Sequence, residues 1–165
     1  MANLKQQIQT DLKEALKRKE VFLCGVLRFL NAAIKNKELE KRAKLAKTQP
    51  IEKLEELSQL SNDEIIEVIS SEIKKRKESI GQFEKGGRSD LVEQEKKELE
   101  ILMDYMPKQM TEEEIRSLVK ETVKKLELKS PKDTGKAMAA LMPQVKGRAE
   151  GGLVNKIVQD EFRGS

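Results

Sequence analysis

The apolar residues of this chain return every three or four positions in nearly every segment, and this repeat is the feature that most constrains its fold. No segment alternates apolar and polar residues as a half-buried strand does. We therefore predict an all-α protein. With 165 residues, the chain is long enough to bury a core as one domain or as two small ones.

The clearest boundary signal in the sequence lies near Pro107, a proline that ends a helix. Thr111 and Glu114 follow it and fit a capping box, in which each side chain accepts a hydrogen bond from the other residue's backbone N–H. We place a domain boundary here. The expected domains are an N-terminal helical domain, residues 1–107, and a small three-helix C-terminal domain, residues 108–165.

Further start and stop signals separate the helices within these domains. Ser61 and Glu64 fit a second capping box, and Gly86 with Gly87 breaks the helix that this box opens. The segment 51–60 fits either a short helix or a mobile connector. The other expected helices are 3–19, 19–47, 61–85, 89–106, 111–126, 130–142 and one that begins near residue 151.

The composition excludes several kinds of chemistry. Without histidine, the chain cannot form a Ser-His-Asp triad, a Cys-His pair or a histidine-ligated metal site. Its single cysteine, Cys24, lies in an apolar run and has no partner for an internal disulfide, so we expect a buried thiol. The sequence contains no P-loop and no nucleophile beside a base. We expect no catalytic residue, no metal and no cofactor.

We also expect a cytoplasmic protein that does not enter a membrane. The apolar run around Cys24 is interrupted by Arg28 and is much shorter than the roughly 20 residues that a membrane helix needs. The N-terminal residues lack the apolar region of a signal peptide and carry acids that a transit peptide avoids.

Charge is uneven along the chain, which has a net charge of +4. Residues 1–60 hold 13 Lys and Arg against 8 Asp and Glu, residues 61–128 hold 13 against 17, and residues 129–165 hold 7 against 4. The basic ends fit a polyanionic partner, and solvated helix faces also explain them. The four cations of Lys74–Lys77 spread around a helical turn and cannot all reach one phosphate surface. Segment 93–100 is expected to be a solvated acidic face.

The stretch 134–159 differs from the rest because it combines glycines, a proline and cations between two short helices. A helix that stops at Pro143, a compact turn at residues 146–148 and a second helix that starts at Gly151 would bring backbone N–H groups and cations to one spot. Such a spot can hold an anion. The alternative is purely structural: Gly147 caps one helix, and the cations are ordinary surface charges.

Three blocks of sequence, in order, resemble the GatB/YqeY family: LRFLNAAIKNKELEKR, then EIKKRKESIGQFEKGGRSDLVEQEKKELEILMDYMPKQMTEEE, then GKAMAALMPQVKGRAEGGLVNKIV. The likeness spans almost the whole chain and is strongest to free-standing YqeY-like proteins. These are similar to the tail of the B subunit of glutamine-dependent aminoacyl-tRNA amidotransferase. The resemblance implies an all-helical protein with a three-helix C-terminal domain, and it implies tRNA as a partner.

The resemblance also implies where the tRNA would bind. In the amidotransferase the tail helps to hold the body of the tRNA, while activation and amide transfer take place in other domains, whose motifs do not occur in this sequence. One position departs from the family pattern, because Glu150 stands where Asp is common and is a weaker N-cap that would compete with a phosphate. The family pattern points to these surface positions in the tail: Lys136, Lys146, Gly147, Arg148 and Gly152.

Three functional hypotheses follow. The first is a tRNA-binding accessory protein that contacts tRNA by shape and phosphates, because a chain with 3% aromatic residues has few platforms for stacking bases. Its further partners would be an aminoacyl-tRNA synthetase or amidotransferase components. The second is a helical protein-interaction module that binds no RNA. The third, by family association alone, is carbon–nitrogen ligase activity with glutamine as the amido-N donor.

Overall fold

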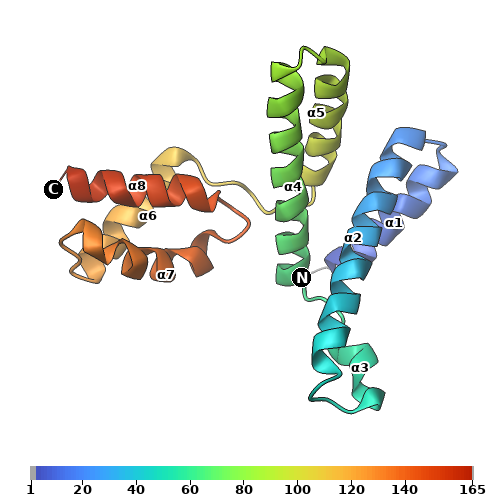
Figure 1. Ribbon diagram of the computed structural model, residues 1–165, viewed down its shortest axis with the longest axis horizontal. Coiled ribbons are helices and arrows are strands. Elements are labelled where there is room, and N and C mark those ends of the chain that lie inside the picture. Colours follow the sequence, from blue (N-terminus) through green and yellow to red (C-terminus); the bar gives the residue numbers. More distant parts are fainter. Residues whose placement is uncertain (1–2, 165) are drawn as a thin grey trace. The chain divides into compact units, whose positions relative to one another are not determined.

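The computed structural model describes residues 3–164. These residues form eight α-helices, one short 3-10 helix and no strand, which confirms the all-α prediction (Figure 1). By its internal contacts the chain divides into two compact units, Met1–Tyr105 and Met106–Ser165. This division lies close to Pro107, where the sequence places the domain boundary.

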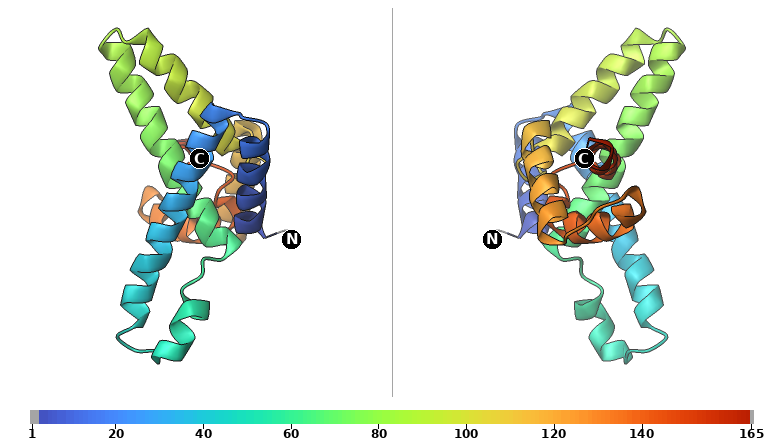
Figure 2. Two further views of the ribbon diagram at one scale, coloured as in Figure 1. Left: turned by 90° about the vertical axis from the view of Figure 1, so that its right-hand side faces the viewer. Right: turned by 90° about the vertical axis from the view of Figure 1, so that its left-hand side faces the viewer.

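The N-terminal unit is organised around its second helix. Its helices are α1 (Leu4–Lys17), α2 (Val21–Leu45), α3 (Ile51–Leu57), α4 (Asn62–Lys85) and α5 (Ser89–Met103). Helix α2 packs against each of the other four, and α4 and α5 lie side by side as an antiparallel hairpin (Figures 1 and 2). On α2, Leu27, Leu30 and Ile34 are at most 1% exposed. Burying a side chain of this size contributes about 1.5–3 kcal/mol.

Helix α4 begins with the predicted capping box. The backbone N–H of Glu64 donates to the Ser61 hydroxyl at 3.2 Å, and the backbone N–H of Ser61 donates to the Glu64 carboxylate at 2.8 Å. The box therefore satisfies two N–H groups that the first turn of a helix leaves without partners.

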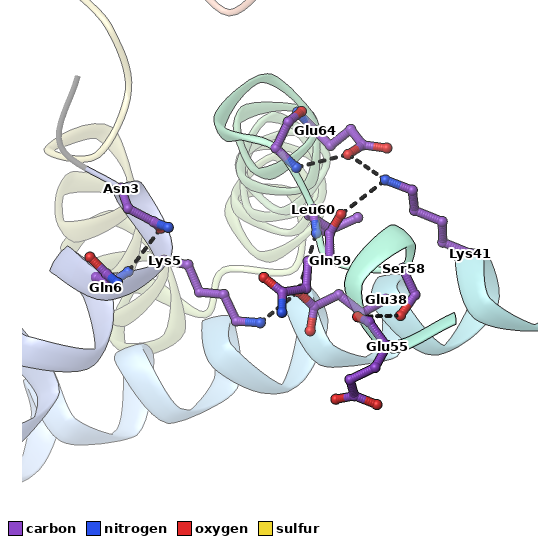
Figure 3. Close-up of polar contacts among 11 residues, drawn as sticks. Asn3, Lys5, Gln6, Glu38, Lys41, Glu55, Ser58, Gln59, Leu60 and Glu64 are labelled. Carbon is purple, nitrogen blue, oxygen red and sulfur yellow. Dashed lines mark hydrogen bonds and ion pairs between the residues drawn. The ribbon is translucent and has the colours of Figure 1, made fainter. Parts of the chain in front are cut away.

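Side chains of α2 hold the connection between α3 and α4 (Figure 3). Lys41 donates to the Gln59 carbonyl at 3.0 Å and to the Glu64 carboxylate at 2.8 Å. One turn earlier, Glu38 accepts from the backbone N–H of Leu60 at 3.3 Å. The hydrogen bond from Lys41, followed by the one from the backbone of the capping box, lowers the pKa of Glu64 below its usual value.

The sequence predicts a solvated acidic face at residues 93–100, and this prediction is wrong for two of its residues. The side chains of Glu95 and Glu98 are only 18% and 16% exposed, because both face Arg76 of α4 across the hairpin. Arg76 lies 2.9 Å from Glu98 and 3.7 Å from Glu95, and its guanidinium is 5.0 Å from the centre of the Phe29 ring. Burial raises the pKa of Glu95, so its ionised form costs stability that Arg76 partly restores.

Cys24 is buried in the N-terminal unit as a free thiol, which confirms the sequence-based prediction. Within residues 3–164, no helix combines the length and the apolar character needed to cross a membrane.

The C-terminal unit is a three-helix bundle with a short 3-10 turn. Its elements are α6 (Glu112–Lys125), η1 (Pro131–Asp133), α7 (Thr134–Val145) and α8 (Gly151–Arg163). The capping box of Thr111 and Glu114 is present at the start of α6, as predicted. The helices share one apolar core, whose buried members are Ile115, Val119, Ala137, Leu141, Val145, Val154, Ile157, Val158 and Phe162.

The end of α5 is tied to α1 by one polar contact, from which a prediction follows. The Tyr105 hydroxyl donates to the Asp11 carboxylate at 2.6 Å. Burial, and then the hydrogen bond and charge of Asp11, raise the pKa of Tyr105 above its usual value near 10. The pKa of Tyr105 is therefore higher in the folded protein than in the unfolded chain. The stabilisation by its contact with Asp11 is complete below about pH 10 and is lost as the pH rises through the folded pKa.

We therefore expect Tyr105→Phe to lower the free energy of unfolding by about 1 kcal/mol at pH 7, as measured by urea denaturation. The difference between the two proteins should persist up to about pH 10 and shrink above it, since Tyr105 then ionises in the unfolded chain while it stays protonated in the folded protein, and this favours unfolding. Identical unfolding curves at pH 7 would contradict a stabilising role for this contact.

Candidate functional site

The sequence-predicted end of α7 at Pro143 is wrong, because the helix continues through Pro143 to Val145. Proline has a backbone φ that suits a helix, and its cost lies in the missing N–H and the crowding of the carbonyl four residues earlier. Only two residues follow Pro143 in α7, so the helix loses one bond near its end instead of breaking. The turn therefore begins one residue before Lys146.

Residues 145–148 form a tight turn that only glycine fits easily. The backbone N–H of Arg148 donates to the Val145 carbonyl at 2.8 Å, which closes the turn. Lys146 has φ −54° and ψ 122°, and Gly147 has φ +71°. These values match a type II β-turn, whose third position needs a positive φ. The sequence-based assignment of Gly147 to a helix-ending turn agrees with this geometry.

The turn is clipped to the segment that enters the C-terminal unit. The backbone N–H of Met110 donates to the Arg148 carbonyl at 2.8 Å, and the Arg148 Nε donates to the Lys108 carbonyl at 3.2 Å. The Gln109 side chain donates to the Gly147 carbonyl at 2.8 Å. We call this set of three hydrogen bonds the 108–148 clip. It fixes the Arg148 backbone and the base of its guanidinium.

Helix α8 begins directly after this turn with small residues. Glu150 occupies the N-cap position, and its side chain makes no capping hydrogen bond, as expected for a poor N-cap. A Cβ added to Gly152 would meet no atom within 4 Å, whereas one added to Gly151 would touch the Met142 side chain at 3.8 Å. The surface at Gly152 is therefore open.

Cations and one carboxylate meet at the clip. The pKa of Glu114 is lowered, first by the hydrogen bond from the Thr111 backbone and also by the positive charges of Lys108 and Arg148. Lys108 and Arg148 therefore lie close enough to Glu114 to stabilise its negative charge. A bound phosphate would share these cations with that carboxylate.

The structure brings together four of the five sequence-predicted site residues, and Lys136 lies apart. Lys146, Gly147, Arg148 and Gly152 lie within the turn and the first turn of α8. Lys136 lies in the first turn of α7, ten residues before Lys146, which is roughly 15 Å along a helix. Its ammonium group is 3.3 Å from the Asp133 carboxylate, and its side chain is 75% exposed.

Sequence reasoning did not assign Lys108 and Gln109 to the site. Their contacts with the turn join residues 38 and 40 positions apart, and no local pattern signals such a contact. Among residues 3–164, no group of three or more histidine, cysteine, aspartate or glutamate side chains is arranged to hold a metal ion.

Comparison with known proteins identifies the family to which this helical chain belongs. The model of the Yqey-like protein family matches residues 5–162, which is nearly all of the sequence. The chain therefore belongs to the YqeY-like family, which is related to the C-terminal tail domain of GatB.

The curated relatives are fungal proteins. The chain is 31% identical over 157 residues to a protein of Pyrenophora tritici-repentis named "Altered inheritance of mitochondria protein 41, mitochondrial", a match that covers 93% of this chain and 78% of the relative. Proteins of the same name from Lachancea thermotolerans and Eremothecium gossypii are 35% and 34% identical over 106 residues, 64% of this chain. The chain spans about half the length of these last two relatives, 47% and 48%.

These names contradict the predicted cytoplasmic location, because each of these relatives is named as a mitochondrial protein. The prediction was wrong for a physical reason. A chain with one buried thiol and no disulfide suits any reducing compartment, so its composition does not distinguish one such compartment from another.

The turn generates a prediction about stability. Replacing Gly147 by Ala should lower the free energy of unfolding by about 1–2 kcal/mol, because a side chain is strained at φ +71°. Replacing Gly152 by Ala is the matched control and should raise it by about 0.5–1 kcal/mol, since the site is helical and open. Chemical denaturation measures both. A loss of stability in the control, or none at Gly147, would contradict this description of the turn.

Proposed function

We propose that this protein is a tRNA-binding accessory protein whose C-terminal unit contacts tRNA phosphates at the turn between α7 and α8. Membership of a family related to the amidotransferase tail supports the proposal. The observation that carries it is the 108–148 clip, which holds Arg148 beside Lys108 and near the start of helix α8. Cations beside a helix N-terminus favour an anion.

The contact would read the shape and charge of the RNA. The Nε–H of Arg148 donates to the Lys108 carbonyl. Because a guanidinium has five N–H donors, the other donors remain for a phosphate. Glu114 competes for the same cations, so binding would be weak and sensitive to salt. Phosphate contacts position an RNA without selecting its sequence.

The proposed role is assistance to tRNA-dependent amidation, with amidotransferase components or an aminoacyl-tRNA synthetase as further partners. Activation of a carboxyl group and transfer of ammonia need groups that the clip and nearby Glu114 do not offer, since their lysine, arginine, glutamine and glutamate side chains lie on an exposed surface. Any association with glutamine-dependent carbon–nitrogen ligase activity would therefore be through such a partner.

Removing the cations tests the proposal. The triple variant Lys136→Ala, Lys146→Ala and Arg148→Ala should bind total tRNA more weakly than the native protein in a gel-shift assay at several salt concentrations. The slope of log affinity against log salt should flatten by roughly 0.7–0.9 for each phosphate interaction that the substitutions remove. Because Lys136 lies apart, Lys136→Ala alone should account for the smaller part of the change.

A matched control removes the same charge elsewhere on the C-terminal unit. The variant Lys120→Ala, Lys124→Ala and Lys156→Ala also loses three exposed cations. It should change tRNA affinity less than the first variant does. Equal losses would show general attraction to the basic unit, and no loss in either would show that this unit does not bind tRNA; both results contradict the proposed site.

A further inference from the structure

Helix α2 has a second apolar face, opposite the one that it buries. Leu27, Leu30 and Ile34 mark the buried face. At 100° per residue, positions 22, 25, 29, 32, 36 and 39 all point within about 70° of the opposite direction. They are spaced alternately by three and four residues, the repeat of a helix that packs along another helix. We call these residues the α2 stripe: Phe22, Gly25, Phe29, Ala32, Asn36 and Leu39.

The α2 stripe is exposed and carries no charge. Phe22, Phe29 and Leu39 are 43%, 48% and 55% exposed, and Val21 beside them is 82% exposed. These are four of the nine large exposed hydrophobic side chains among the described residues, so exposed apolar surface gathers on this helix. A Cβ added at Gly25 would meet no atom within 4 Å. An apolar face of this kind marks a contact surface.

The middle of the α2 stripe borders a groove, which gives a partner a concave seat. The groove has a volume of about 710 Å³, with Phe29 and Ala32 on the α2 side and Val68 on the α4 side. Most charged side chains on its walls are already paired within the protein, as the N···O distances show: Lys37–Glu40 3.0 Å, Lys41–Glu64 2.8 Å and Lys75–Glu72 2.8 Å.

A row of cations runs along the other edge of the α2 stripe. Arg28, Lys35 and Arg42 recur every seven residues and therefore lie on one line of the helix surface. Arg42 pairs with Glu55 at 2.7 Å. Within the part of the chain that the structure describes, neither Arg28 nor Lys35 makes an ion pair, so this edge presents positive charge that the protein does not neutralise.

We propose that the α2 stripe docks an amphipathic helix of another protein, with apolar side chains at heptad spacing and acidic side chains along the edge that meets Arg28 and Lys35. From Phe22 to Leu39 the seat is roughly 26 Å long, about five helical turns. Its lack of charge suits apolar side chains and not phosphates. A second copy of this chain would bring the same basic row into the interface, where like charges repel. The partner is therefore an acidic helix.

Designed peptides test this proposal on the full-length protein. The probe is a fluorescently labelled helical peptide of about three heptads, with Leu at its a and d positions and Glu at e and g, kept at nanomolar concentration to limit its self-association. A second peptide has Lys in place of Glu. Fluorescence anisotropy should show binding of the acidic peptide and at least about tenfold weaker binding of the basic one.

Two kinds of variant locate the binding surface. Ala32→Glu puts a charge in the middle of the α2 stripe and should weaken binding of the acidic peptide at least about tenfold. Ala139→Glu, at an exposed alanine of α7, is the matched control and should leave binding unchanged. The double variant Arg28→Glu and Lys35→Glu should reverse the preference between the two peptides. Circular dichroism checks that each variant retains its helix content.

Several results would overturn the proposal. The two peptides could bind equally well, or neither could bind at concentrations up to about 1 mM. The Ala32→Glu variant could also bind the acidic peptide as tightly as the native protein does. A native dimer that Ala32→Glu dissociates in analytical ultracentrifugation would assign the α2 stripe to a second copy. Weaker tRNA binding by Ala32→Glu, with peptide binding intact, would assign it to RNA. The triple variants of the C-terminal unit test tRNA binding separately. Failure of either proposal therefore leaves the other testable.

Discussion

The N-terminal unit depends on one helix that must serve every other helix around it. Helix α2 contacts α1, α3, α4 and α5, and on one of its faces Leu27, Leu30 and Ile34 are almost wholly buried. Replacing one such leucine by alanine typically costs about 2–5 kcal/mol, so this face leaves little room for variation. The opposite face is apolar too, although Phe22, Phe29 and Leu39 on it stay between 43% and 55% exposed.

Local signals in the sequence predicted the helices well. A capping box involves residues three positions apart, and both boxes, at Ser61 and at Thr111, are present where the sequence placed them. The helical period predicted the fold class for the same reason, since it repeats within a single turn. Contacts between helices gave no such signal. Arg76 lies in a run of four cations that spread around a helical turn, and no local pattern shows that it packs on Phe29 and pairs with Glu98 of the next helix.

In the candidate site too, local patterns could be predicted from the sequence and long-range contacts could not. Residues 146–148 were recognised because glycine beside two cations is a local pattern, whereas Lys108 belongs to the site only through a contact 40 positions away in the sequence. Lys136 was grouped with them by its place in the same motif, and the length of α7 separates it. The face of α2 that is exposed could not be chosen from the sequence, because both faces carry apolar residues at helical spacing.

The 108–148 clip has a consequence for how freely this part of the sequence can change. Two of its three bonds end on the backbone of the entering segment, at the Lys108 carbonyl and the Met110 N–H, so neither of those side chains is needed to hold the turn. Only Gln109 contributes a side chain from that segment. Mutation can therefore alter the charge at position 108, and with it the attraction for a polyanion, while the turn keeps its shape. The shape of the turn and the charge at position 108 can therefore be selected independently.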